Sequence, residues 1–239
     1  MCLGSLSEEL QEQLANKIMF YIPCPGLEKG IPVAQSVVGT WIIMAVILAV
    51  SIIMTRKLSI VPTTKRQLLI ETAVSSLNKF FGGILGEAGK RYIPYLSTVL
   101  IYIGAANISG VFGLKSPTKD LGVTAALALM SIALIEGSCI RARGGKGFLK
   151  SLAEPVPIML PINILEIGIR PLSLCMRLFG NVLGAFVVME LLEIVLKGIK
   201  PLTLIFSFYF DFFDGFIQAY VFVFLTSLFM LEGIEPKKK

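Results

Sequence analysis

Long apolar runs alternate with short charged patches along most of the chain. The first run, residues 37–55, is long enough to cross a bilayer as a helix, and Trp41 near its start suits a membrane interface. Four further apolar helices are predicted, at about residues 93–114, 121–140, 157–196 and 201–231. The last two exceed the ~20 residues that a perpendicular span needs, so we expect a strongly tilted, antiparallel helix hairpin at the C-terminal end.

Two other segments carry a mixed pattern. Residues 65–90 are amphipathic, which predicts an interfacial helix on the cytoplasmic side. Near the start, Ser5 and Glu8 suit a capping box, and a leucine stripe that ends at Ile18 predicts a short amphipathic helix. The expected fold is therefore an all-α integral membrane protein, with an outer N-terminal segment over residues 1–36 and a single membrane domain over residues 37–239.

Charge sets the expected topology. The chain has 22 Lys and Arg against 16 Asp and Glu, a net charge of +6, and the basic residues gather in short patches. These patches follow the first span at Arg56 and Lys57, fill a Gly-rich loop at residues 141–150 and end the chain at 237–239. The positive-inside rule then predicts five crossings, with the N-terminus outside and the C-terminus cytoplasmic. The one-sided bias and the lack of a transit peptide favour a bacterial plasma membrane.

Composition excludes several classes of protein. Hydrophobic residues make up 55% of the 239 positions, far more than a soluble domain of this size requires. The chain has no His and no paired Cys motif, which argues against a metal or haem cofactor. No basic face is interleaved with aromatics, so nucleic acid is not an expected partner. The Gly-rich loop lacks the strand and the Lys-Ser/Thr ending of a phosphate-binding loop.

One charged residue stands alone in the longest apolar hairpin. Arg177 has no other charge within six positions, and a guanidinium at bilayer depth costs at least ~2.5–3.5 kcal/mol. Helical spacing places it on one face with other polar or small residues, namely Glu166, Arg170, Ser173, Asn181 and Gly184. Charges inside membranes usually mark ion or substrate paths, so this face is the primary candidate site.

The last helix carries a matching polar face. Ser207, Asp211, Asp214 and Gln218 follow at helical spacing in a Phe-rich sequence. If the turn centres near residues 197–198, facing residues have numbers that sum to about 395. Arg177 is then expected level with Gln218, and Asn181 level with Asp214.

Simpler interpretations remain open for some of these residues. Arg170 beside Pro171 is equally consistent with a side chain that extends to the interface. Ser173 and Asn181 are also typical of helix-packing contacts in membranes, and an Arg177–Asp pair can be purely structural. A secondary ion-coupled solute transporter is the alternative function, although no internal repeat or paired broken helices are present. A membrane hydrolase would need a nucleophile with a base, and no such motif occurs.

Several motifs resemble one family. SLCMRLFGN resembles the Arg-Leu-Phe-Gly-Asn signature of the a subunit of rotary F-type ATP synthases. SPTKDLGVTAALAL is similar to the family's Pro-Thr-x-Asp-Leu helix start, and LPINILE to its Pro-x-Asn-x-x-Glu stretch. FIQAYVFVFLTSLFM resembles the Gln-Ala-Phe-x-Phe segment of the final helix. The resemblance covers roughly residues 93–232 and includes the order of the spans.

The resemblance implies a non-catalytic, ion-translocating stator subunit. Arg177 would face the ion-binding carboxylate of the c-subunit ring, lower the pKa of that carboxylate and separate two offset half-channels. Gln218 and Asn181 would support the arginine. Asn107, Asp120, Asp211 and Asp214 would line the outer half-channel, and Glu166 and Ser173 the cytoplasmic one. The implied partners are the c ring, peripheral-stalk b subunits and the lipid bilayer, with no cofactor.

The chain also departs from the family pattern. Nine residues after the arginine, where many members carry an acid, stands Phe186. The position in the final helix that is often His or Glu is Asp211, with Asp214 close behind. These changes suggest that the acid of the outer path has moved to the last helix. Without histidine, the path relies on carboxylates and water, which suits a proton and also suits a sodium ion.

Overall fold

The computed structural model describes residues 18–23, 31–56, 58–59, 64–112, 116–153, 158, 160–196, 205–206 and 208–234. Within this part of the chain, five helical segments are long and apolar enough to cross a membrane. They cover residues 35–55, 65–108, 121–145, 160–189 and 208–234. The expected all-α membrane architecture is confirmed.

A short hairpin precedes the first span. β1 (Ile18–Ile22) pairs antiparallel with β2 (Ile31–Ala34), and α2 (Gln35–Thr55) begins directly after β2. The prediction of a helical stripe was wrong at Ile18, which lies in β1, and the rest of that stripe lies outside the described residues. The β-branched and aromatic composition of IMFYI favours a strand once a second strand pairs with it. No residue of α2 is buried, as expected for a helix surrounded by lipid.

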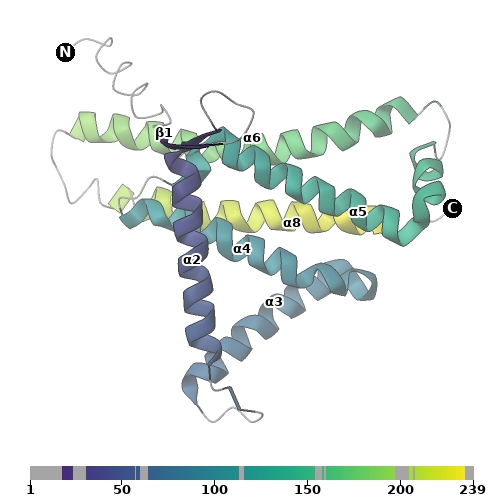
Figure 1. The fold of residues 1–239 in the computed structure, drawn as a ribbon, viewed down its shortest axis with the longest axis horizontal. Coiled ribbons are helices and arrows are strands. Elements are labelled where there is room, and N and C mark those ends of the chain that lie inside the picture. The colour runs from purple at the N-terminus through teal and green to yellow at the C-terminus, as the bar shows by residue number, and fades with distance from the viewer. Residues whose placement is uncertain are drawn as a thin grey trace.

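The second spanning segment consists of two helices. α3 (Lys65–Gly89) and α4 (Ile93–Ile108) are separated by a short 3-10 turn, and the break begins at Gly86, whose φ of 61° suits glycine alone. α3 runs obliquely from the foot of α2, and α4 turns back above it (Figure 1). α4 ends earlier than predicted, because residues 109–112 tighten into a 3-10 turn.

α5 (Leu121–Ala153) is longer than the predicted helix at 121–140. The prediction of a basic loop at residues 141–150 was wrong, since this segment is helical. Gly144, with a φ of 72°, interrupts the helix, and the Arg, Lys and Leu residues around it are good helix formers. The segment therefore consists of two helical parts joined by a kink at Gly144.

The C-terminal hairpin pairs α6 with α8. α6 (Leu160–Leu196) contains Pro171, and α8 (Gly215–Ile234) follows a π-helical turn, η5 (Phe208–Asp214). The predicted regular helix over 201–231 is therefore not uniform. A π-turn bonds residues five apart, so the polar face assumed at α-helical spacing does not continue unchanged through residues 208–214.

The arrangement in space agrees with strong tilt of this hairpin. α6 and α8 run across the direction of α2 rather than along it, and α8 lies among α3, α4 and α5 (Figure 1). The buried core includes Leu96, Ile103, Ile135, Leu178 and Phe222, which come from α4, α5, α6 and α8. Two spans that differ this much in direction cannot both be perpendicular to one bilayer, so we take α2 as the upright span and the hairpin as the inclined one.

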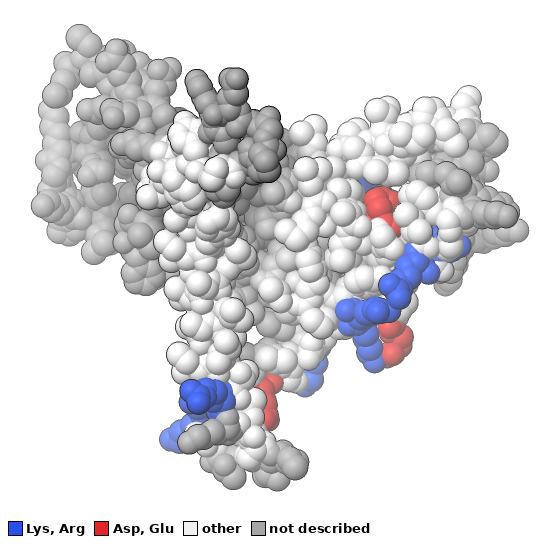
Figure 2. Space-filling model, viewed as in Figure 1, with Lys and Arg blue, Asp and Glu red and all other residues white. Residues whose placement is uncertain are grey.

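Charged residues are confined to parts of the visible surface. Figure 2 shows Lys and Arg, with some Asp and Glu, from the foot of α2 along the lower edge of the view to the end where α5 and α8 end, while most of the coloured surface above this edge is uncharged. Five exposed apolar residues of α2 illustrate that uncharged surface, namely Trp41, Ile42, Val46, Leu48 and Ile53. This distribution is typical of a surface in contact with lipid.

Candidate functional site

Arg177 lies on the exposed side of α6. The neighbouring side chains of Leu174 and Leu178 are 1% and 0% exposed and anchor the helix to the core. The exposed side continues through Leu172, Met176 and Gly180, so the guanidinium stands in a surface of apolar and small residues. Among the described side chains, Arg177 has no ion-pair partner. A cation held in this way can meet a carboxylate that another chain supplies.

Asn181 and Gln218 connect the two helices of the hairpin. The Asn181 side-chain amide donates a 2.6 Å hydrogen bond to the side-chain oxygen of Gln218, which is 3% exposed. The expected register was wrong, because these two numbers sum to 399 and not to 395. The difference of four residues corresponds to about one helical turn. Gln218 is therefore level with Asn181, and Arg177 lies one turn of α6 before that level.

A buried polar junction lies between α4 and the start of α8. The Asn107 amide donates to the Gly215 carbonyl oxygen at 2.9 Å, and the Asn107 oxygen accepts from the Thr118 hydroxyl at 2.7 Å. A Cβ on Gly215 would lie 2.7 Å from the Asn107 Cβ, so only glycine permits this approach. Asn107 is thereby fixed as a structural bridge between three elements.

Beside this junction is a cavity of about 20 Å³, enough for one water molecule. Asn107 and the half-buried Asp214 both line it, together with Lys119 and Phe186. The Lys119 ammonium lies 4.2 Å from the centre of the Phe186 ring, within the range of a cation–π contact. Two residues predicted for the outer half-channel thus meet at one cavity.

The other residues predicted for that half-channel lie elsewhere or are undescribed. Asp120 accepts hydrogen bonds from the Ser36 hydroxyl and, at 2.8 Å, from the Gly122 backbone N–H. It therefore caps α5 and ties it to α2, and it does not line the cavity with Asp214. The side chain of Asp211 and the whole of Ser207 lie outside the described part of the chain.

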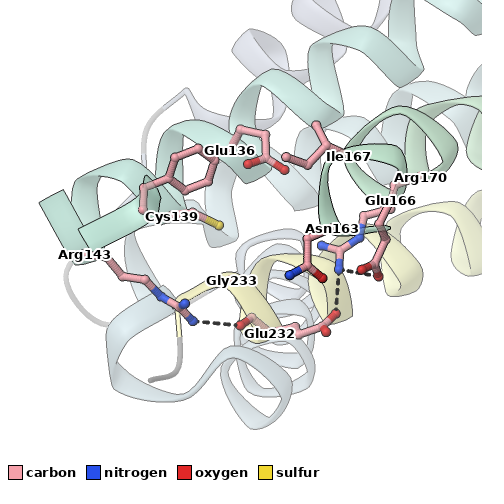
Figure 3. Close-up of a pocket in the computed structure, with 10 residues that line it drawn as sticks. Glu136, Cys139, Arg143, Asn163, Glu166, Ile167, Arg170, Glu232 and Gly233 are labelled. Carbon is pink, nitrogen blue, oxygen red and sulfur yellow. Dashed lines mark hydrogen bonds and ion pairs between the residues drawn. The ribbon is translucent and has the colours of Figure 1, made fainter. Parts of the chain in front are cut away.

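A second cavity lies at the opposite end of the hairpin, near the C-terminal end of α8. It has a volume of about 80 Å³, which accommodates several water molecules, and α5, α6 and α8 all contribute to it (Figure 3). The Arg170 guanidinium contacts the carboxylates of Glu166 at 2.7 Å and Glu232 at 3.0 Å. Arg170 is 14% exposed, so it does not simply extend to the interface. Ser173 is exposed on α6 and does not line this cavity.

Comparison with known proteins decides the family. The sequence profile of the "ATP synthase A chain" family matches residues 37–231. The chain belongs to this family. Its similarity extends to the ATP synthase subunit a of Moorella thermoacetica, with 36% identity over 82% of this chain and 88% of that protein.

Other bacterial members of the ATP synthase A chain family show comparable similarity. The "ATP synthase subunit a, sodium ion specific" of Propionigenium modestum is 32% identical over 91% of this chain and 84% of its own length. The ATP synthase subunit a of Legionella pneumophila (strain Philadelphia 1) is 31% identical over 86% and 89%. The resemblance found in the sequence motifs is therefore confirmed for the family, which is one of membrane proteins.

Four polar residues of the larger cavity were not predicted from the sequence. Glu136, Arg143, Asn163 and Glu232 line the larger cavity but were not among the expected site residues. One signal was present, because Glu136 is the single acid in the apolar run 121–140 and lies seven residues, or two turns, before Arg143. The contribution of Glu232 depends on the register of the hairpin, which the sequence alone did not provide.

Proposed function

We propose that this chain is the membrane stator subunit of a rotary ATP synthase and that it guides ions past a ring of c subunits. The observation that carries the proposal is the position of Arg177, an exposed cation on an apolar helix face with no ion-pair partner among the described side chains. Bringing such a cation into a membrane is costly unless a carboxylate outside this chain meets it. The ion-binding carboxylate of a c-subunit ring would be that partner.

The chemistry of the arginine follows from electrostatics. A guanidinium close to a carboxylic acid lowers the pKa of that acid, so a ring carboxylate releases its ion beside Arg177 and takes up another after the ring has turned. Because Arg177 keeps its charge at any physiological pH, it also repels cations that would move directly between the two sides. The Asn181–Gln218 bond lies one turn away and fixes α6 against α8 at this level.

Two polar regions, displaced to either side of Arg177, would supply the ion paths. The outer path would include Asp214 and Asn107, which line the small cavity. Asp120 and Asp211 would be its further acids. The cytoplasmic path would include Glu166 at the larger cavity and Ser173 between that cavity and Arg177. In this orientation the N-terminus is outside, the C-terminus is in the cytoplasm and the membrane is the bacterial plasma membrane.

Reconstitution tests this function directly. Liposomes are prepared with the c ring and b subunits, with this chain alone, and with all components together. Passive flux of H⁺ and of Na⁺ is measured in each under an imposed potential. We expect flux only when this chain and the ring are both present. Ion-coupled solute uptake by the chain alone would instead identify a secondary transporter, and flux through the ring without this chain would also contradict the proposal.

A further inference from the structure

Arg170 occupies an unusual position at the inner end of the hairpin. Its side chain is 14% exposed, whereas the two carboxylates that it contacts, from Glu166 on α6 and Glu232 at the end of α8, are 48% and 54% exposed. The guanidinium also lies 5.0 Å from the centre of the Phe229 ring. The cation is thus held inside, while its carboxylate partners stand at the surface on both sides of it.

The same guanidinium lines the cavity of about 80 Å³. In Figure 3, Glu136 on α5 points into the space framed by Arg143, Glu232 and Arg170. Arg143 donates to the Glu232 backbone oxygen at 3.2 Å, which leaves the Glu232 carboxylate directed toward Arg170. Three helices therefore place charged groups around one cavity that is large enough for several water molecules.

The balance of charge at this cavity is uneven. Among the described residues that line it, three carboxylates, those of Glu136, Glu166 and Glu232, accompany two guanidiniums, those of Arg143 and Arg170. When all are ionised, this cluster has one excess negative charge. Such an excess attracts one monovalent cation or proton.

We propose that Arg170 is a positioning residue of the ion path, which fixes Glu166 and Glu232 at the mouth of this cavity, and that Glu136 is the carboxylate that exchanges the ion. This inference rests on the proposed function. Arg170 keeps the mouth weakly attractive to cations, so that an ion enters and also leaves. Without Arg170 the same three carboxylates hold the ion too tightly, and without Glu136 the cluster is neutral and holds it too weakly.

The test uses the complete complex in oriented liposomes. Ion is supplied on the face that carries this cavity, and flux is measured against concentration for H⁺ and Na⁺, whichever the wild type conducts. Arg170→Gln is expected to lower the half-saturating ion concentration roughly tenfold and to lower the maximal rate. Glu136→Gln is expected to raise the half-saturating concentration by a similar factor. The double variant restores the original net charge but lacks the exchanging carboxylate, so its half-saturating concentration is expected to return toward the wild-type value while its maximal rate stays low.

Controls separate this role from a structural one. Arg141→Gln changes an exposed arginine of α5 that does not line the cavity, and no shift is expected. Arg170→Lys keeps the charge and is expected to recover most of the wild-type concentration dependence, even where Arg170→Gln reduces the amount of complex. Shifts in the same direction for Arg170→Gln and Glu136→Gln, or an unchanged half-saturating concentration in the assembled variants, would overturn the inference. Absence of ring-dependent flux in the wild type would instead refute the proposed function.

Discussion

The Asn181 amide and the Gln218 side-chain oxygen form a 2.6 Å hydrogen bond between α6 and α8. This bond fixes the register of the two inclined helices next to Arg177. Gln218 is almost fully buried, and its own amide nitrogen has no partner among the described residues. The bond from Asn181 is therefore what offsets the cost of burying the Gln218 side-chain oxygen, and its loss leaves that oxygen unpaired.

A double-mutant cycle on this pair measures the bond. We expect Asn181→Ala and Gln218→Ala each to destabilise the chain, and the double variant to lose less than the sum of the two. The expected coupling is about 0.6–1.7 kcal/mol, the range for hydrogen bonds between membrane helices. Unfolding in mixed detergent gives the free energies. Additive losses would show that the two amides do not interact, and the register inferred from them would then lack support.

Gly215 provides a test of close packing. A Cβ at this position would lie 2.7 Å from the Asn107 Cβ, so Gly215→Ala should force α4 and α8 apart and cost about 1–3 kcal/mol. Gly104, on α4, has open space around its Cβ position and supplies the matched control. Thermal stability of the purified variants distinguishes them. Equal melting temperatures for Gly215→Ala and Gly104→Ala would contradict the packing described for Asn107.

Phe186 and Lys119 give a test of the small cavity that Asn107 and Asp214 line. The ring lies 4.2 Å from the ammonium, so Phe186→Leu should lose a cation–π contact of about 0.5–2 kcal/mol, while Phe186→Tyr should keep it. The difference between Leu and Tyr should decrease when Lys119 is replaced by Gln. Melting temperatures of the four combinations provide the measurement. A Leu–Tyr difference that is independent of Lys119 would mean that the ring contributes through packing alone.

Much of the architecture follows from the sequence, and the exceptions have physical causes. The long apolar runs placed α2, α4 and α6 within a few residues, because a bilayer requires about 20 apolar residues for each helix. The helical continuation through residues 141–153 and the π-turn at 208–214 were missed. The glycines and charges of the first segment suggested a loop despite its good helix formers, and a π-turn has no apolar periodicity that distinguishes it from an α-helix.

The sequence identified the main polar residues of the hairpin but not how they are paired. Arg177, Asn181 and Gln218 stood out because polar groups in apolar helices are costly, and the last two do meet. Their level was displaced by one turn, because hydropathy does not fix the register between two helices. Glu232 joins Arg170 only through this register, so its role required the three-dimensional structure.

The transported ion is accessible to a chemical test. The relative from Propionigenium modestum is named sodium ion specific, and the polar groups of this chain, which include no histidine, suit either ion. Labelling of the ring carboxylate by a carbodiimide is measured in the complex with and without Na⁺. Protection by Na⁺ at constant pH indicates a sodium path. Labelling that responds to pH alone indicates a proton path.

We infer that the charge of Arg177 drives ion exchange at the ring. Ion-driven ATP synthesis by complexes that carry Arg177→Ala measures this most directly, with Arg141→Ala as the matched exposed-arginine control. Both variants should assemble normally with the ring, because the Arg177 side chain makes no ion pair among the described residues. We predict that Arg177→Ala abolishes synthesis while Arg141→Ala retains it. Synthesis at the wild-type rate by the assembled Arg177→Ala complex would contradict the account.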